Sequence, residues 1–237
     1  MEKKKKNNII IIGLIIIICL ILLIIGKYLL TSKKYIQVDN SLTLSLCSEN
    51  QNCSLNPIKY TKFKSSLNNK EFNSVIEEAN KEVQERYDNS LNSEIKKGSE
   101  CESSTLLKYG KYSEIDYTLF ENRKYISFVY NFYDEDFCLD TSKNTKPVVV
   151  IYSKKAHKVI SQKQLQKEQK ITEKEIFKQI ETATVSLNYH TGIYYSLNNI
   201  YKNSKPLYWL YFNSKGKLSI MYYQAIDDSY NTYTITN

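Results

Sequence analysis

Glycine, proline and histidine are scarce in this chain, and each scarcity excludes a class of site. The 237 residues include six glycines, three prolines and two histidines. The four glycines after residue 30 lie far apart: Gly98, Gly110, Gly192 and Gly216. They cannot form the glycine-rich loops with which many nucleotide enzymes hold phosphate. No C-x-x-C pair occurs, and both histidines stand far from the cysteines, so the usual structural zinc patterns are absent.

Catalytic signatures are also missing. His190 has the chemistry of a general base, but neither a G-x-S-x-G elbow nor an activated cysteine accompanies it. His157 lies in a charged turn of lysines, where a surface histidine is expected. We therefore predict a protein that is not an enzyme and that holds no cofactor or metal.

One long apolar run is present, at the N-terminus. Ile9–Gly26 consists of isoleucine and leucine apart from two glycines and Cys19, and Lys3–Lys6 precede it. Its length of roughly 27 Å as a helix is close to the hydrocarbon thickness of a bilayer. The run is longer than the core of a signal peptide, and no small-residue cleavage site follows it. We predict an uncleaved transmembrane anchor over residues 9–30.

The charges around the anchor favour one orientation only slightly. A short N-terminal tail and a long following domain nevertheless make a cytoplasmic N-terminus the default. This predicts a cytoplasmic tail at 1–8, a polar stalk at 31–57 and an extracytoplasmic domain at 58–237, on the outer side of the cell membrane. A sub-boundary near 155–160 is a further option, because the hydrophobic period changes there.

Four cysteines follow the anchor: Cys47, Cys53, Cys101 and Cys138. An even number in an exported domain predicts two disulfides, with three connectivities open. Cys47 and Cys53 flank a short polar loop that a local bridge can close. We therefore favour the pairs 47–53 and 101–138.

The charge balance bounds the partners. Without Lys3–Lys6, Lys27 and Glu2, the totals of 33 basic and 25 acidic residues fall to 28 and 24. The lysines are spread out rather than clustered, so nucleic-acid binding is not expected. A mildly basic domain suits an anionic surface. The expected partners are the lipid bilayer, through Ile9–Gly26, and peptidoglycan, an anionic wall polymer or another envelope protein.

Hydrophobic periodicity predicts an α+β fold with mainly antiparallel sheet and packed helices. Helices are predicted over Asn69–Tyr87, after the capping pattern at Ser161, and from Thr172. The predicted strands are Tyr112–Phe120, Tyr125–Tyr133, Val148–Tyr152, Leu207–Phe212, Lys217–Gln224 and Tyr230–Ile235. Alternation along Tyr125–Tyr133 predicts a half-buried strand.

The densest acidic cluster falls in a predicted loop, Asp134–Lys146. It contains Asp134, Glu135, Asp136 and Asp140. The glycine and distal glutamate of an EF-hand are not at the required spacing. A solvated loop is the favoured interpretation, and a cation site is the alternative.

Aromatic residues gather in the last predicted hairpin. Alternation sends Trp209 and Tyr211 to one face and Tyr208, Leu210 and Phe212 to the other. One face must be core. The other is either ordinary cover or a candidate binding platform for glycan or protein, made of Trp209, Tyr211, Met221 and Tyr223.

Three segments carry a family resemblance: Tyr125–Tyr130, His157–Phe177 and Gly216–Tyr223. They resemble a strand, a turn with its helical segment and a terminal strand in the extracytoplasmic domain of lysozyme-sensing anti-sigma factors of the RsiV type. Membrane-anchored peptidoglycan deacetylases of the PdaC type carry a similar domain. The resemblance implies an α+β domain facing a bacterial envelope. Asp134–Lys146 replaces the glycine-rich loop of the family, the inner tail is short and no deacetylase domain follows, so neither activity is carried over.

The sequence therefore predicts a single-pass envelope protein whose outer domain binds a ligand or partner without catalysis. Two alternatives stay open. One is a structural subunit of a membrane complex, and the other is an envelope hydrolase with an unrecognised site.

Overall fold

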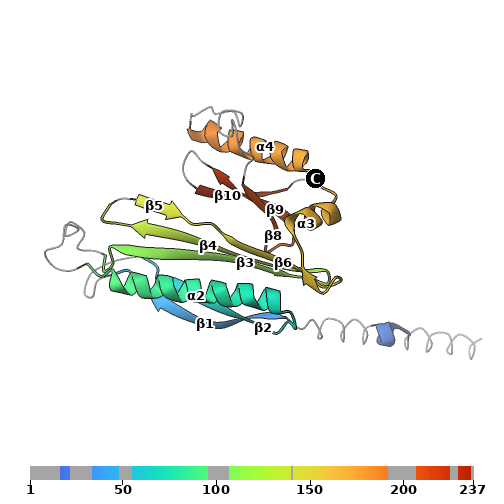
Figure 1. Ribbon diagram of the computed structural model, residues 1–237, viewed down its shortest axis with the longest axis horizontal. Coiled ribbons are helices and arrows are strands. Elements are labelled where there is room, and N and C mark those ends of the chain that lie inside the picture. The colour runs from blue at the N-terminus through green and yellow to red at the C-terminus, as the bar shows by residue number, and fades with distance from the viewer. Residues whose placement is uncertain are drawn as a thin grey trace, which may run out of the picture. The chain divides into compact units, whose positions relative to one another are not determined.

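A computed structural model describes residues 17–21, 34–47, 55–95, 107–139, 141–191, 207–224 and 229–235 (Figure 1). The chain divides into two compact units, Met1–Tyr35 and Ile36–Asn237. In the first unit, residues 17–21 are helical. Among the described residues, no helix has the length and apolar character needed to cross a membrane. Most of the predicted anchor lies outside the described residues.

The second unit is α+β with antiparallel strands, which confirms the predicted fold class. In chain order its elements are β1 (Ile36–Leu44), β2 (Ile58–Ser65), α2 (Lys70–Asn92), β3 (Lys111–Glu121), β4 (Tyr125–Asp136), β5 (Thr141–Asn144), β6 (Val148–Ser153), β7 (Lys158–Val159), α3 (Gln162–Gln169), α4 (Glu173–Thr191), β8 (Tyr208–Phe212), β9 (Leu218–Gln224) and β10 (Ser229–Thr234). The predicted stalk at 31–57 thus contains a strand, β1, which pairs with β2.

Within the described residues, the strands form three sheets. β1 and β2 form a two-stranded sheet, and β8, β9 and β10 form a second sheet in the order β10-β9-β8. The third sheet has the order β3-β4-β6-β7, with β5 paired to β4. The β3–β4 turn is fixed by Asn122, whose Oδ1 accepts from the backbone N–H groups of Lys124 and Tyr125, both at 2.8 Å. Such local side-chain bonds are why asparagine favours turns.

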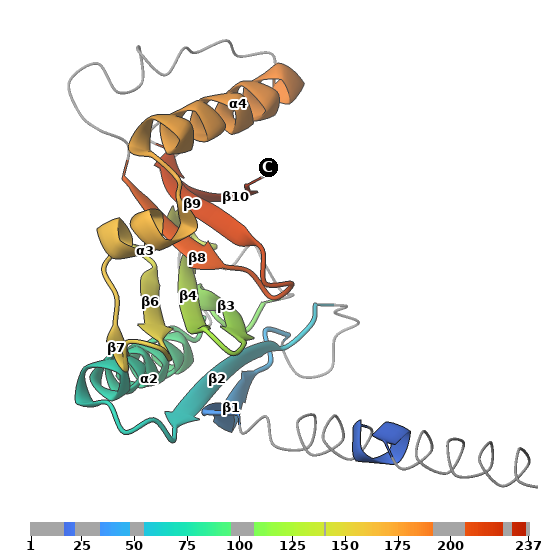
Figure 2. The same cartoon turned by 90° about the vertical axis from the view of Figure 1, so that its right-hand side faces the viewer.

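The central strand β4 is buried on both faces, not on one face as predicted. Its residues from Tyr125 to Phe132 are all buried. On one side the Phe128 ring packs edge-on against Phe63 of β2, with the centroids 5.4 Å apart. On the other side Tyr125 stacks on Phe212 of β8 at 4.9 Å. Figure 2 shows β4 between α2 and β2 on one side and β8 on the other.

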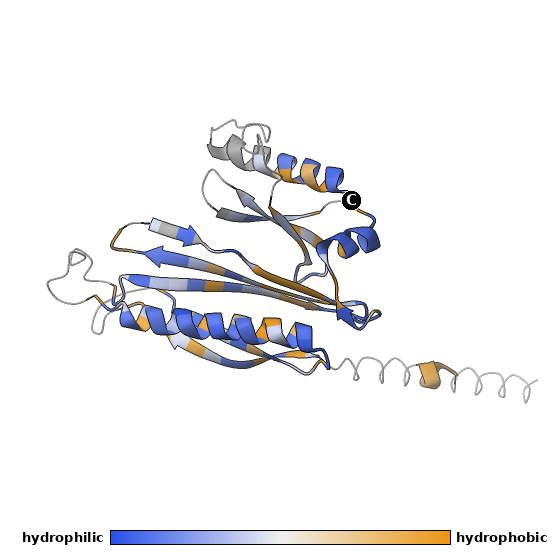
Figure 3. Cartoon of the chain, in the orientation of Figure 1, coloured by the Kyte–Doolittle hydropathy of each residue, from blue (hydrophilic) through white to orange (hydrophobic). Residues whose placement is uncertain are grey.

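Helix α2 covers the first of these faces. Asn69 caps it, because its Oδ1 accepts from the N–H of Phe72 at 2.8 Å. The buried positions follow one stripe: Phe72, Ile76, Ala79 and Val83. Figure 3 shows hydrophobic (orange) bands recurring among hydrophilic (blue) ones along this helix. The helix continues five residues past the predicted end at Tyr87, to Asn92.

Helices α3 and α4 begin where the capping patterns predict. The Ser161 hydroxyl accepts from the N–H of Gln164 at 3.2 Å. Thr172 and Glu175 form the full reciprocal capping box, since Thr172 Oγ1 accepts from the Glu175 N–H and Glu175 Oε2 accepts from the Thr172 N–H. The two helices bury Leu165 and Ile176 in the same core as Leu210 of β8.

Two side-chain amides cover strand edges. The amide of Asn80 in α2 accepts from the N–H of Phe63 and donates to its C=O, at 2.9 and 2.7 Å. The amide of Gln162 makes the same pair of bonds with Leu210 in β8. Each amide thus replaces the neighbouring strand that β2 and β8 lack on that side.

Candidate functional site

A polar cleft of about 680 Å³ opens between the C-terminal half of α2 and the adjoining ends of β3, β4 and β5. Helix α2 contributes Glu85 and Asn89 to its lining, its C-cap Ser93 follows, and β5 contributes Thr141 and Lys143. These side chains offer hydroxyl, amide and charged groups from several elements. A concave region with converging polar groups is the default place for a ligand.

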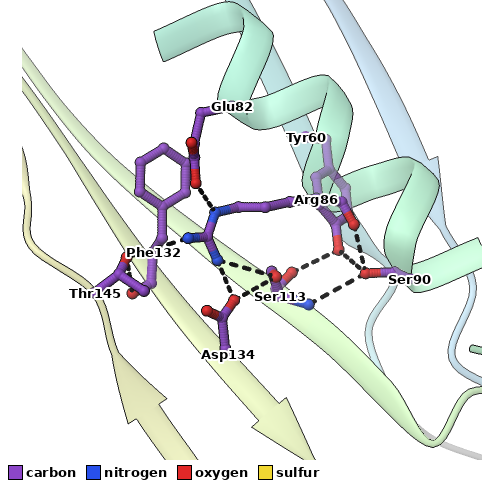
Figure 4. A network of polar contacts seen from close by, with 8 residues as sticks. All are labelled: Tyr60, Glu82, Arg86, Ser90, Ser113, Phe132, Asp134 and Thr145. Atoms are coloured by element: carbon purple, nitrogen blue, oxygen red, sulfur yellow. Dashed lines mark hydrogen bonds and ion pairs between the residues drawn. The ribbon is translucent and has the colours of Figure 1, made fainter.

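Arg86 organises one wall of the cleft (Figure 4). Its side chain is only 12% exposed, and it bridges two carboxylates, from Glu82 on its own helix at 2.8 Å and from Asp134 on β4. The guanidinium lies over the Phe132 ring, 4.6 Å from the centroid. The cation is therefore paired, stacked and largely removed from water, which fixes α2 onto the sheet.

Hydroxyl groups extend this network. Arg86 Nη1 also donates to Ser113 Oγ at 3.3 Å, and that hydroxyl donates to Asp134 at 2.6 Å. Behind it, the Tyr60 hydroxyl donates to the Ser113 C=O at 2.6 Å and shares a hydrogen bond with Ser90. Burial raises the pKa of Tyr60 above its ordinary value, so its hydroxyl keeps the donated proton to a higher pH than an exposed tyrosine would. The network joins β2, α2, β3 and β4.

The predicted acidic loop is mostly strand, which corrects the sequence interpretation. β4 runs to Asp136, and β5 turns back to pair with its end. Asp134 pairs with Arg86, while Asp136 pairs with Lys111 at 3.2 Å. Among the described residues, no group of three or more histidine, cysteine, aspartate or glutamate side chains is placed to hold a metal ion. Asp140 lies outside the described residues.

Glu135 differs from its two neighbours. It has no ion pair within the described part of the chain, and its pKa is raised, first by burial and then by the negative charges of Glu114 and Asp134. Strand alternation separates Glu135 from Asp134 and Asp136, because successive side chains point to opposite faces. The acidic cluster of the sequence is therefore divided between two faces of one strand.

The cysteines after the anchor are described in part. Cys47 and Cys138 are disulfide-bonded, and Cys47 forms a β-bridge with Leu107. Cys53 and Cys101 lie outside the described residues, so the favoured pairing 47–53 and 101–138 stays a prediction. A β-carbon on Gly110 would lie 2.7 Å from the Cys138 sulfur, so glycine permits this close approach. Cys19, in the first unit, is a free thiol.

The predicted aromatic platform is largely internal. Met221 and Tyr211 are 1% and 6% exposed, so neither offers contact area to a ligand. Trp209 and Tyr223 are half-buried, and each ring packs against Tyr230 of β10, at 5.6 and 5.3 Å. The four residues form no exposed platform because this face of the sheet is covered as well.

His157 is not among the described residues that line the cleft. His157 is exposed in the turn between β6 and β7, with φ at 53°. The side chain of His190 lies outside the described residues. Arg86, by contrast, was not predicted from the sequence. A signal was present, because Arg86 continues the stripe of Ala79 and Val83 at helical spacing, and an arginine on an apolar stripe needs a buried partner.

No protein-family model and no curated protein matches this chain. The resemblance to the RsiV and PdaC types therefore stays a prediction. Fold and cleft together define the chain's second unit as an α+β domain with a polar groove whose wall is held by an internal ion-pair network.

Proposed function

We propose that this chain is a single-pass membrane protein whose outer domain binds a component of the bacterial cell envelope without catalysing a reaction on it. The observation that carries the proposal is the disulfide-bonded state of Cys47 and Cys138 in the domain that follows the apolar run Ile9–Gly26. Disulfides persist in oxidising compartments, and the run supplies the means of staying at the membrane surface.

The energetics of the run support the anchor. Fifteen of its eighteen residues are isoleucine or leucine. At roughly −0.3 to −0.6 kcal/mol each, they favour insertion by about 5–9 kcal/mol. The N-terminal tail then lies in the cytoplasm and the domain lies outside, where envelope polymers and proteins are its neighbours.

The cleft between α2 and β3–β5 is the proposed binding place. Its internal ion pairs, Arg86 with Asp134 and Lys111 with Asp136, cancel much of the charge that would attract a strongly ionic polymer. Asn89 and Thr141 are exposed in the lining, so an amide and a hydroxyl group are accessible to a ligand. This chemistry favours a polar ligand rich in hydroxyl groups, and therefore the glycan of peptidoglycan over an anionic wall polymer.

Binding is tested with the full chain in lipid nanodiscs, mixed with insoluble peptidoglycan at low and at physiological salt. We expect retention that changes little with salt, because direct polar contacts rather than counterion release hold the ligand. The variant Asn89→Ala/Thr141→Val should lower retention by about tenfold, or 1.4 kcal/mol. Lys70→Ala, an exposed change at the other end of α2, should leave it unchanged. Failure of the native chain to bind even at low salt contradicts the proposal.

The location is tested separately by intact mass with and without reductant. Two disulfides in the native protein predict a mass increase of about four hydrogens after reduction. Four free thiols at positions 47, 53, 101 and 138 would place the domain in a reducing compartment and overturn the outer location, whatever the cleft binds.

A further inference from the structure

Among the described residues, the outer edge of β3 carries backbone groups without a hydrogen-bond partner. β3 is the last strand of its sheet and pairs residue for residue with β4, without a bulge. The N–H of Ser113 donates to Ser90 Oγ at 3.3 Å and its C=O accepts from Tyr60, so both groups point away from β4. In an antiparallel strand, alternate residues direct their backbone groups to the same side. The backbone N–H and C=O groups of Ile115, Tyr117 and Leu119 therefore also point away from β4.

The hydrogen bonds of the neighbouring strand β4 indicate the same direction for these backbone groups independently. Phe132 is the partner of Ile115 across the ladder, and its C=O accepts from the N–H of Thr145 at 3.1 Å. That carbonyl points away from β3, so Phe132 and Ile115 are a non-hydrogen-bonded pair of the antiparallel ladder. The backbone of Ile115 is thus directed to the free side of the sheet.

Three other strand edges in this unit, those of β1, β2 and β8, are covered or interrupted. Asn80 bonds to the edge of β2 and Gln162 to the edge of β8, while β1 carries an irregularity between Val38 and Asn40. Such devices protect edges from pairing with other chains. On β3 the cover ends early: Ser93 bonds to Lys111, and Ser90 and Tyr60 bond to Ser113. Within the described residues, no side chain bonds to the outward backbone groups of 115, 117 or 119.

The side chains along this edge give it two distinct faces. Tyr117 is 41% exposed, and its ring packs on Phe63 at 4.8 Å. Ile115 and Leu119, on the same face, are half-buried. The opposite face presents Glu114 and Asp116, which are exposed and have no ion pair among the described residues. One row is apolar and the other is acidic.

We propose that the edge of β3 over Ile115–Leu119 receives an extended segment of a partner protein as an added strand. The segment carries basic residues on the side of Glu114 and Asp116 and apolar residues on the side of Tyr117. Charge selects this occupant over a second copy of the same edge, because two copies would bring like-charged carboxylates together. Backbone hydrogen bonds supply affinity and alternate side chains supply specificity, as in strand addition generally. The proposal is independent of glycan binding in the cleft.

The test uses the full chain in lipid nanodiscs and a short fluorescent peptide of alternating lysine and valine. A peptide of the same sequence, N-methylated at alternate residues so that one edge lacks donors, is the control. We expect saturable binding of the first peptide and binding weaker by about tenfold or more for the second. Hydrogen exchange of wild-type protein should show new protection at the amides of Ile115, Tyr117 and Leu119, because these become bonded to the peptide.

Two pairs of variants complete the test. Leu119→Pro removes an outward N–H but no ladder bond to β4, while Leu119→Ala makes a similar side-chain truncation and keeps the N–H. We expect only the proline variant to lose binding by about tenfold, and Asp116→Lys to lose as much, whereas Glu78→Lys, an exposed change on α2, should not. Equal binding of both peptides, protection elsewhere, no binding by folded protein, or dimerisation of the chain through this edge would each overturn the proposal.

Discussion

Gln162, the first residue of α3, forms a closed pair of hydrogen bonds with the backbone of Leu210 in β8. Its Oε1 accepts from the Leu210 N–H at 2.6 Å, and its Nε2 donates to the Leu210 C=O at 3.2 Å. A side-chain amide has the same donor and acceptor as a peptide group, so one residue performs the work of an adjoining strand. The helix start and the sheet edge are thereby locked together.

Replacing Gln162 by leucine should destabilise the domain by about 1–3 kcal/mol, because both backbone groups of Leu210 lose their partner. The midpoint of urea unfolding measures the loss. Lys163→Ala on the same helix is the matched control, since Lys163 is exposed, and we expect its effect to stay within about 0.5 kcal/mol. Equal midpoints for the two variants would mean that water replaces the amide without cost.

Arg86→Ala should cost about 2–4 kcal/mol. This loss of stability is toward the lower end of what breaking a buried ion pair costs, because the Asp134 side chain is 39% exposed while that of Arg86 is 12% exposed. The exposed pair Lys81–Glu85 on the same helix, 3.7 Å apart, is the control, and Lys81→Ala should cost less than about 0.5 kcal/mol. The double variant Arg86→Met/Asp134→Leu should recover much of the loss, because the only carboxylate that it leaves without Arg86 is that of Glu82, whose side chain is 43% exposed to water. A loss in the double variant as large as the sum of the single losses would exclude coupling between the two side chains.

Tyr125 and Glu168 should give stability a pH dependence at both extremes. The Tyr125 hydroxyl donates to Glu168 Oε2 at 2.6 Å. Burial, together with Glu168, raises the pKa of Tyr125 from 10.0 to about 12. Between these values the unfolded chain releases this proton and the folded chain keeps it, so stability falls as pH rises through that window.

The acid side has the opposite sign. The hydrogen bond from Tyr125 lowers the pKa of Glu168, so its contribution is present above the ordinary value of about 4.3 and is lost as pH falls below it. Tyr125→Phe keeps the stacking on Phe212 and removes the bond. Urea midpoints measured across pH should therefore change less steeply at both ends in this variant. Identical slopes in the variant and the native chain would contradict the assignment.

Gly216→Ala tests the turn between β8 and β9. Gly216 has φ at 74°, and a β-carbon there would lie 2.6 Å from Cε2 of Phe120. Backbone strain and steric overlap together should cost about 2–4 kcal/mol. In a Phe120→Ala background the overlap is gone, so the same change should cost only about 1–2 kcal/mol. Thermal unfolding of the four proteins completes the cycle, and an unchanged cost in both backgrounds would exclude the ring as the cause.

Local patterns predicted most elements of the second unit. The capping residues Ser161 and Thr172 and the apolar stripe of α2 act over a few residues, so they are visible in the sequence. The sequence does not predict β1, because its interior residues are exposed apart from the half-buried Leu42, and only its ends, Ile36 and Leu44, are buried. Such a strand carries almost no alternation.

The candidate site was less accessible to prediction, because its contacts join distant parts of the chain. Arg86 and Asp134 are 48 residues apart, and the sequence shows their charges but not their separation in space. The sequence predicts a loop at Asp134, because three acidic residues in succession are typical of a solvated loop. The cover over the predicted platform has the same origin, since burial of Tyr211 and Met221 depends on elements from elsewhere in the chain.

The two-sided burial of β4 has a consequence for how this domain can come apart. Because the side chains of β4 pack into a core on each face, neither half of the domain can separate from the other without exposing buried residues. Cutting the chain near residues 155–160 would expose Val129 and Ser127 on one fragment and strip Phe212 of its partners on the other. The layers on either side of β4 should therefore unfold in a single cooperative transition, and a destabilising substitution in either core should lower the stability of both.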